Sequence, residues 1–479
     1  MNTESTIQIR SGTYIGGRWL DPGGESFVVE NPATGAPIAA VAQSAITDAD
    51  AALTAADDAR TGWAATPARQ RAEILHRVDS LVRAHADELA ALIVAEAGKR
   101  LADARAEVNY GADFLRWYAE EAVRIGGRYG ELPEGSGTMY VSRRPVGPCL
   151  LLTPWNFPLA MITRKVAPAL AAGCTAVVKP SELTPLTCYR FVDLLEEAGV
   201  PPGVVNVIST DRPAPFSERL LSDARLRKVS FTGSTPVGRD LTRQAADQMI
   251  RTSMELGGDA PLLVLSDADI GTATEGTLIA KFRGSGQACT AANRILVAAA
   301  VADEYLGRLA ERVDAMHSGP GDDPSSSIGA LIDARAVRRT VQRVDDAVAD
   351  GFEVRAQGTI THSDGYFAPA TVLARTGGRA PGVEWFAPVA AVNVYDDEDE
   401  LVEQAAASDS GLASYIFSQD IGRARRIAGR LEVGMTAINT GLLSNAAAPF
   451  GGVKASGHGR EGGPEGLDSY LESHYLLER

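Results

Sequence analysis

The chain has few cysteines, and their arrangement suggests neither a bridge nor a metal site. Its 479 residues contain four, Cys149, Cys174, Cys188 and Cys289, with no C-x-x-C pair and no cluster with histidine. Disulfide frameworks and structural metal sites need paired or closely spaced ligands, so we expect neither a disulfide nor a bound metal. The pattern fits a protein of the reducing cytoplasm.

Basic charge and long apolar stretches are also scarce. Acidic residues outnumber basic ones by 61 to 46, giving a formal net charge of −15, so no broad basic face is expected for nucleic acid or an anionic membrane. No apolar run approaches eighteen residues, and residues 1–18 lack the apolar core of a signal peptide. We therefore expect neither a membrane span nor export.

The apolar content is ample for two or three domains, because 45% of the residues are hydrophobic. Apolar spacing predicts helices over residues 48–63, 68–97 and 101–125, with Gly98 ending the second. From residue 140 onward, strand-like and helix-like segments alternate. The expected strands are 146–153, 175–179, 204–208 and 228–232, and the expected helices are 159–172, 186–198 and 236–250. This order predicts an α/β fold with right-handed βαβ units and a doubly wound parallel sheet, followed by a second α/β stretch from about residue 261.

Two strand-like segments stand apart from this alternation, at residues 137–145 and 469–477. Isolated hairpins are marginally stable in water, so pairing across subunits would stabilise them. We expect a small β oligomerisation element and a homo-oligomer.

Cys289 is a candidate nucleophile in the run Arg283-Gly-Ser-Gly-Gln-Ala-Cys-Thr-Ala-Ala-Asn-Arg294. The run is rich in glycine and separates an amphipathic stretch, 271–282, from a strand-like one, 295–299, so the thiol can reach a cleft at the end of an element. A free cysteine is more often an inert buried side chain. What favours a catalytic role is the presence of Met254-Glu-Leu-Gly-Gly258 and Thr153-Pro-Trp-Asn-Phe-Pro158, which offer a carboxylate and an amide donor.

A candidate cofactor site begins at Val229-Ser-Phe-Thr-Gly-Ser-Thr-Pro-Val-Gly238. A strand ends at Gly233, Ser234 and Thr235 can cap a helix, and Pro236 suits the first helical position. Free N–H groups and the dipole at such a helix start favour a pyrophosphate. The same features also describe a well-capped helix that binds nothing.

These motifs, in this order and over nearly the whole chain, resemble the aldehyde dehydrogenase superfamily. The closest resemblance is to succinate-semialdehyde dehydrogenases, carried by Met161-Ile-Thr-Arg-Lys165, Lys281-Phe-Arg283 and Asn439-Thr-Gly-Leu-Leu-Ser-Asn445. The likeness implies a cofactor domain at residues 1–124 and 146–257, a catalytic domain at 258–455, and an oligomerisation element at 125–145 and 456–479. It also implies a dimer or tetramer.

The resemblance assigns roles that match the chemistry of aldehyde oxidation. Cys289 would add to the carbonyl, Asn156 and the Cys289 N–H would stabilise the oxyanion, and Glu255 would activate water to release the thioester. Glu255 could otherwise be an ordinary surface charge. The cofactor contacts implied by the resemblance are Thr153, Pro154, Trp155, Lys179, Ser181, Glu182, Gly233, Ser234, Leu256, Gly257, Glu384 and Phe386.

The expected cofactor is NAD, with NADP as an alternative. A carboxylate at Glu182 can accept from both ribose hydroxyls but repels a 2′-phosphate. Glu384 lies in Glu-Trp-Phe-Ala-Pro388, where the family pattern has glycine in place of Ala387. If that position needs a positive φ, alanine would be strained there.

The expected substrate is an aldehyde with a distal carboxylate, such as succinate semialdehyde. Arg164 lies in an apolar helix, where an unpaired guanidinium is costly, and Arg283 is close to the nucleophile in sequence; both could anchor the carboxylate, with Ser444 as a third contact. Each arginine could instead form a structural salt bridge or extend to solvent. Glutarate semialdehyde or an aliphatic or aromatic aldehyde would use the same machinery. A non-catalytic, crystallin-like protein is disfavoured because Cys289, Glu255 and Asn156 are all present.

Overall fold

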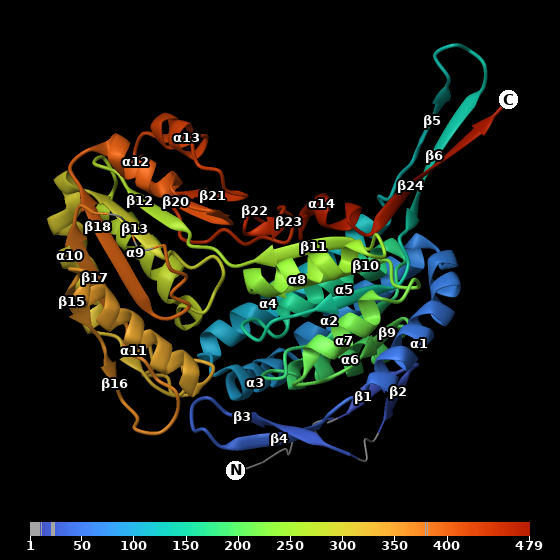
Figure 1. Ribbon diagram of the computed structural model, residues 1–479, viewed down its shortest axis with the longest axis horizontal. Helices are drawn as coiled ribbons and strands as arrows, with labels where there is room; N and C mark the ends of the chain where they lie inside the picture. The colour runs from blue at the N-terminus through green and yellow to red at the C-terminus, as the bar shows by residue number, and fades with distance from the viewer. Residues whose placement is uncertain (1–9, 11, 21–23, 379, 381) are drawn as a thin grey trace.

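The structure is a computed structural model that describes residues 10, 12–20, 24–378, 380 and 382–479. Figure 1 shows two lobes, each built on one large sheet, and a thin arm of three strands that projects from the body. Strands and helices alternate in both lobes, which confirms the α/β prediction. The sequence predicts no signal peptide in residues 1–18, and of these, residues 1–9 and 11 lie outside the described residues.

The first sheet has a parallel centre in which β9, β8, β7, β10 and β11 pair in that order. These strands are β9 (Val205–Val207), β8 (Ala176–Lys179), β7 (Cys149–Leu152), β10 (Lys228–Gly233) and β11 (Arg251–Leu256). Antiparallel β1 (Thr13–Ile15) and β2 (Arg18–Leu20) extend one edge, and β23 (Gly457–His458) extends the other. A segment from late in the chain therefore lies beside β11.

Helices cover both faces of this sheet because successive strand residues point to opposite sides. Leu150 and Val177 pack with α1 (Ile46–Ala65), α7 (Pro213–Leu221) and α8 (Thr235–Ala246). Leu151 and Val178 pack with the helices of the other face. That second layer consists of α2 (Ala68–Ala84), α3 (Ala86–Ala97), α4 (Leu101–Ala122), α5 (Ala160–Ala172) and α6 (Leu186–Glu197).

Three local predictions need correction. Residues 68–97 form two helices, because His85 leaves the helical conformation at φ −102° and ψ 22°. The helix expected at 236–250 is α8, which begins at Thr235 and ends at Ala246. Pro236 therefore takes the second helical position, and the Ser234 side chain makes no capping hydrogen bond.

The second sheet is also mainly parallel, with the order β15-β17-β18-β13-β12-β20-β21. Its strands are β15 (Glu353–Gln357), β17 (Thr371–Thr376), β18 (Val389–Tyr395), β13 (Arg294–Ala298), β12 (Pro261–Val264), β20 (Ala413–Phe417) and β21 (Met435–Ile438). The helices of this lobe are α9 (Ile270–Phe282), α10 (Ala299–Asp314), α11 (Ala334–Ala349), α12 (Glu398–Ala406) and α13 (Ile421–Ala428). The second α/β stretch is thus present where the sequence predicts it.

The projecting arm is an antiparallel sheet with the order β24-β6-β5. Its strands are β5 (Arg128–Glu131), β6 (Thr138–Pro145) and β24 (Leu471–Glu478). Large apolar side chains are exposed on it, with Tyr129 at 70% and Tyr475 at 52%. The two strand-like segments singled out in the sequence therefore pair with each other.

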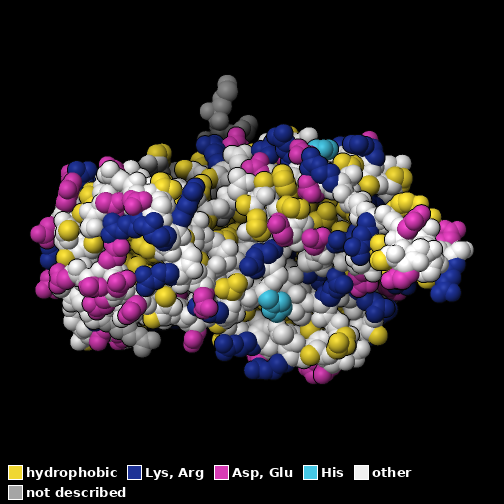
Figure 2. Space-filling model, turned by 90° about the horizontal axis from the view of Figure 1, so that it is seen from above, with side chains coloured by type: hydrophobic (Ala, Val, Ile, Leu, Met, Phe, Trp, Pro, Cys, Tyr) yellow, Lys and Arg dark blue, Asp and Glu magenta, His cyan; other side chains and the backbone are white. Residues whose placement is uncertain are grey.

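The surface carries charges of both signs. On the face shown in Figure 2, acidic and basic side chains are interspersed, and no broad basic area is visible. Within the described ranges, every helix is too short or too polar to cross a bilayer.

Gly98 lies at a contact between the two lobes. It has φ +68° and follows α3, and its carbonyl accepts a hydrogen bond of 3.0 Å from the Ala330 N–H. A Cβ at Gly98 would lie 2.9 Å from the Ala330 Cβ, so a side chain would push the two lobes apart. This glycine is needed both for its conformation and for the close approach.

We therefore expect Gly98→Ala to destabilise the protein more than a matched change at Gly135. Gly135 has φ +66° but nothing within 4 Å of an added Cβ. Gly135→Ala should lower the free energy of unfolding by about 1 kcal/mol, because alanine disfavours the left-handed backbone. Gly98→Ala should lower it by about 1–3 kcal/mol more, because of the clash. Thermal unfolding followed by circular dichroism compares the two variants. Equal losses would show that the contact with Ala330 does not matter.

Candidate active site

A cavity of about 280 Å³ opens where β10 and β11 end. Both lobes contribute to it, and the carboxyl ends of parallel strands are where α/β sheets bind ligands. The lining residues are Pro154, Trp155, Asn156, Thr232, Gly233, Ser234, Glu255, Leu256, Gly257, Cys289, Arg339, Arg343, Glu384 and Phe386. Eleven of the predicted site residues thus meet here, and Thr232 of β10 with Arg339 and Arg343 of α11 are additions that the sequence did not suggest.

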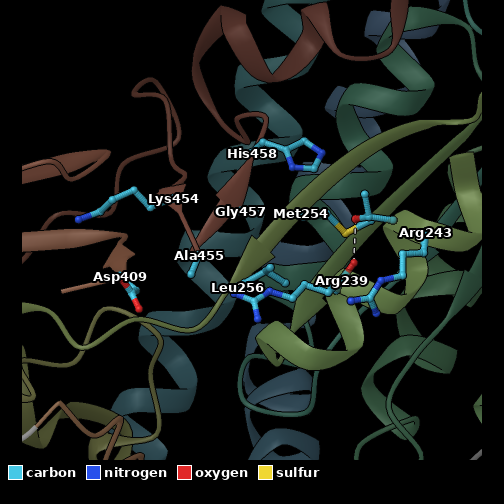
Figure 3. A pocket seen from close by; sticks show the side chains of 11 residues that line it. Arg239, Arg243, Met254, Leu256, Asp409, Lys454, Ala455, Gly457 and His458 are labelled. Carbon is cyan, nitrogen blue, oxygen red and sulfur yellow. Dashed lines mark hydrogen bonds between the residues drawn. The ribbon is translucent and has the colours of Figure 1, made fainter.

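A larger hollow of about 550 Å³ lies on the other side of β11 (Figure 3). Arg239 and Arg243 of α8 line it, opposite Lys454 and His458. None of the predicted catalytic residues lines this hollow. The smaller cavity is therefore the candidate active site.

Cys289 follows a strained turn that is held by the second lobe. The turn is the short helix η1 (Arg283–Gly286), in which Ser285 has φ +59° without being glycine. Ser285 Oγ donates to the Gly329 carbonyl at 3.0 Å, and the Ile332 N–H donates to Gln287 Oε1 at 3.0 Å. These bonds fix the loop that carries the thiol, which is partly exposed in the cavity.

The thiol of Cys289 is held in its protonated form. Burial is the main cause that raises its pKa to about 12; the charge of Arg164 opposes the rise, and the carboxylates of Glu384 and Glu255 add to it. A proton must therefore leave Cys289 when its sulfur attacks an electrophile.

Glu255 projects from β11 into the cavity and is only 3% exposed. Its neighbour Met254 packs into the apolar core, and side chains alternate along a strand. Neither carboxyl oxygen of Glu255 has a hydrogen-bond partner within the described part of the chain. Burial raises its pKa well above the usual value, the nearby Glu461 raises it further, and Arg164 and Lys165 oppose the shift. When ionised, Glu255 is thus a stronger base than an exposed carboxylate.

Asn156 lies in the loop after β7, beside the nucleophile loop. Its Nδ2 donates a hydrogen bond of 3.0 Å to the Gln287 carbonyl, which orients the amide. The amide nitrogen carries a second hydrogen that remains available to a ligand. The three predicted catalytic residues, Asn156, Glu255 and Cys289, therefore line one cavity.

The predicted cofactor residues divide into two groups. Eight of them line the cavity: Pro154, Trp155, Gly233, Ser234, Leu256, Gly257, Glu384 and Phe386. The other four lie at the ends of β7 and β8, where the Thr153 N–H donates to the Lys179 carbonyl at 3.2 Å. Lys179 Nζ lies 3.7 Å from Glu182 Oε2, and burial lowers the lysine pKa. Ser181 Oγ lies 3.4 Å from the same carboxylate, which extends the group at the strand ends.

The segment that carries Glu384 has its positive φ at Phe386, which has φ +49°, and not at Ala387. The strain that we considered for alanine therefore falls on its neighbour. Arg343 clamps the segment by donating to the carbonyls of Glu384, at 2.5 Å, and Trp385, at 3.2 Å. Burial raises the pKa of Glu384 to about 7.

Arg164 is one of the predicted substrate residues, and it is 1% exposed. Its Nε forms an ion pair with Glu461, and its guanidinium lies over the Phe450 ring at 4.2 Å. Its Nη2 is buried without a partner among the described residues. The salt-bridge alternative is thus present, yet one donor of the guanidinium remains for a ligand.

Arg283 and Ser444 lie on the same side as Arg164. The charges of Arg164 and Arg283 both act on the Tyr110 hydroxyl, and Ser444 lies next to it. Sequence reasoning did not identify Tyr110, Lys165 or Glu461. Lys165 and Glu461 are ion-paired in the interior, and the signal in the sequence was a second cation directly after Arg164 in an apolar helix.

The fold and the cavity are those of an aldehyde-oxidising enzyme, and the chain belongs to the aldehyde dehydrogenase family, whose model matches residues 19–476. Succinate-semialdehyde dehydrogenase of Paenarthrobacter nicotinovorans is 51% identical over 92% of this chain and 98% of its own length. The NADP⁺-labelled succinate-semialdehyde dehydrogenase of Escherichia coli K12 is 42% identical over 99% of both chains. A crystal structure of succinate-semialdehyde dehydrogenase from Burkholderia pseudomallei has a TM-score of 0.96 at 41% identity and covers 100% of both chains.

The raised pKa of Cys289 predicts how the thiol reacts with iodoacetamide. Because the thiolate is the reactive form, the alkylation rate should keep rising from pH 7 to pH 10. Cys149, Cys174 and Cys188 are each 0% exposed, so Cys289 should be the first site modified. Peptide mass spectrometry measures the rate, and Cys289→Ala is the control. A plateau reached below about pH 8 would mean that the thiolate is already present in the resting protein.

Proposed function

We propose that this protein oxidises succinate semialdehyde, or a similar aldehyde with a distal carboxylate, to the acid with NAD(P). The observation that carries the proposal is the buried guanidinium of Arg164, whose Nη2 has no partner in the described ranges and whose charge acts on Cys289. A buried cation with an unused donor is costly unless an anion completes it. The similarity to succinate-semialdehyde dehydrogenases supports the same substrate.

The catalytic roles follow from the cavity. The thiol of Cys289 gives its proton to the Glu255 carboxylate, which passes it on to solvent, and Sγ adds to the aldehyde carbon. Asn156 Nδ2 and the Cys289 N–H donate to the oxyanion that forms. NAD(P), when bound, supplies the hydride acceptor. Glu255 then takes a proton from the water that attacks the thioester, and the cysteine sulfur is the leaving group.

The residues at the cavity fit a dinucleotide. The free N–H groups at the start of α8 suit a pyrophosphate, because Ser234 makes no capping bond there. A Cβ at Gly257 would lie 2.6 Å from Glu384 Oε2, so the glycine leaves room for the carboxylate that would hold a ribose. The Trp155 and Phe386 rings meet edge to face at 5.4 Å and frame the cavity.

We further propose the domain limits that the sequence suggested: cofactor domain 1–124 and 146–257, catalytic domain 258–455, and oligomerisation element 125–145 and 456–479. The separate sheets support the division at residue 258, whereas β23, within 456–479, pairs with β11 of the first sheet. The arm that projects from the body in Figure 1 has exposed apolar side chains, which supports a homodimer or homotetramer. Four free cysteines support a reducing, cytoplasmic compartment.

The first prediction concerns the cofactor. Glu182 repels a 2′-phosphate, so the wild type should prefer NAD, and Glu182→Ser should reduce that preference. The side chain of Glu182 is 36% exposed, but it pairs with the mostly buried Lys179, so a modest loss of stability is expected and thermal unfolding of the variant measures it. The measurement is kcat/KM with each dinucleotide. A wild type that prefers NADP would contradict the repulsion argument.

The second prediction concerns the substrate. Arg283→Met should lower kcat/KM for succinate semialdehyde by about ten- to 150-fold, because a charge-assisted hydrogen bond worth roughly 1.5–3 kcal/mol is lost. Butyraldehyde, which lacks the carboxylate, should be unaffected. Arg283 is a better choice than Arg164, because removing Arg164 would take one of the two ion-pair partners from the buried Glu461 carboxylate.

Arg312→Met is a matched control, because Arg312 pairs with Glu275 at the surface of the same lobe. Arg312→Met should leave kcat/KM unchanged for both succinate semialdehyde and butyraldehyde. Glutarate semialdehyde belongs in the panel as the longer alternative. The proposal fails if the wild type prefers butyraldehyde, and Arg283 loses its assigned role if both aldehydes are affected equally.

A further inference from the structure

A cavity of about 280 Å³ lies between α4 and residues 444–447. Tyr110 and Trp117 of α4 line one side, and Ser444 lines the other. Arg164 connects this cavity electrostatically with the candidate active site, since its charge lowers the pKa of both Tyr110 and Cys289. Ser444, which the sequence predicts to contact the distal carboxylate, lines this cavity.

Tyr110 is held rigidly in this position. A Cβ at the next residue, Gly111, would lie 3.2 Å from Thr163 Oγ1 and 3.4 Å from the Ala160 Cα, so the glycine lets α4 approach α5 closely. The tyrosine ring packs edge to face on Phe114, one turn along α4, with ring centroids 4.9 Å apart. This packing fixes the phenol ring next to the helix that carries Arg164.

The hydroxyl of Tyr110 is buried, and Arg164 and Ser444 lie beside its oxygen and lower its pKa as hydrogen-bond donors, while no described group accepts the tyrosine proton. Arg164 Nη2 is also buried, and it makes no hydrogen bond of good geometry within the described residues. The groups that act on the tyrosine hydroxyl are Arg164 and Arg283, which only donate, and Ser444, which can donate or accept. Arg164 can donate to the tyrosine oxygen, but neither arginine can accept the tyrosine proton. Leaving a buried donor unpaired costs about 1–3 kcal/mol, so the site favours a ligand that brings an acceptor.

We propose that the Tyr110 hydroxyl donates a hydrogen bond to the distal carboxylate of the substrate and is a specificity-determining residue. This inference rests on the proposed function. A carboxylate has two acceptor oxygens and no donor, so it can satisfy Tyr110, Arg164 and Ser444 together. A methyl end would leave these buried donors unpaired, and sites built to hydrogen-bond a polar group discriminate strongly against analogues that lack it.

The test is Tyr110→Phe, which removes the hydroxyl and keeps the ring that packs on Phe114. We expect kcat/KM for succinate semialdehyde to fall by about tenfold or more, mainly through KM, with butyraldehyde unchanged. Tyr118→Phe is the matched control, because it removes another buried hydroxyl from α4, one that lies near the Gly462 backbone and does not line the cavity. If Tyr118→Phe lowers kcat/KM, it should lower it by the same factor for both aldehydes.

A second measurement does not depend on turnover of the semialdehyde. Succinate should inhibit butyraldehyde oxidation, and Tyr110→Phe should raise its inhibition constant about tenfold. An unchanged inhibition constant, or an equal loss on both aldehydes, would overturn the role of Tyr110. A wild type that prefers butyraldehyde would instead overturn the proposed substrate, and the succinate measurement would still decide whether Tyr110 binds a carboxylate.

Discussion

The arrangement of the site depends on one buried carboxylate. Glu461 forms ion pairs with Arg164 and Lys165 of α5, and all three side chains are almost completely buried. Burial raises the pKa of Glu461, but the two cations outweigh this effect and hold it below the usual value. Because buried charges are tolerated only with partners, the pairing fixes the helix and turns the remaining donor of Arg164 away from Glu461. The same charges set how strongly Glu255 and Cys289 hold their protons.

Much of this could be predicted because the chemistry lies in short local motifs. Glu255 lies near the end of β11, just before two glycines, and Asn156 follows β7, so a parallel sheet brings these two positions together. Cys289 lies after the glycine-containing turn η1, between α9 and β13. The alternation of strands and helices in both lobes was equally readable. The charge network was not, because Glu461 is 297 residues from Arg164 and nothing in the local sequence links them. Arg343 was missed for a similar reason, since it acts through backbone carbonyls on a segment 41 residues away.

The errors are also local, and their causes are physical. Residues 68–97 have continuous helical spacing, but His85 interrupts the helix without a proline or glycine to mark the break. The family pattern drew attention to Ala387, whereas the backbone takes its positive φ one residue earlier, at Phe386. Tyr110 is apolar enough to read as a core position in an amphipathic helix. What distinguishes it is its place in the cavity beside Ser444, with Arg164 acting on its hydroxyl.

The position of Glu461 in the chain has a consequence for synthesis. Arg164 and Lys165 leave the ribosome almost 300 residues before their counter-ion does. Until then α5 carries two adjacent cations that cannot be buried at an acceptable cost, so the first lobe cannot close its core as it emerges. β11 likewise lacks its edge partner β23 until residues 457–458 have been made. The lobe that is made first should therefore be among the last to become native, and its unfinished surface would be the part of the nascent chain that needs a chaperone.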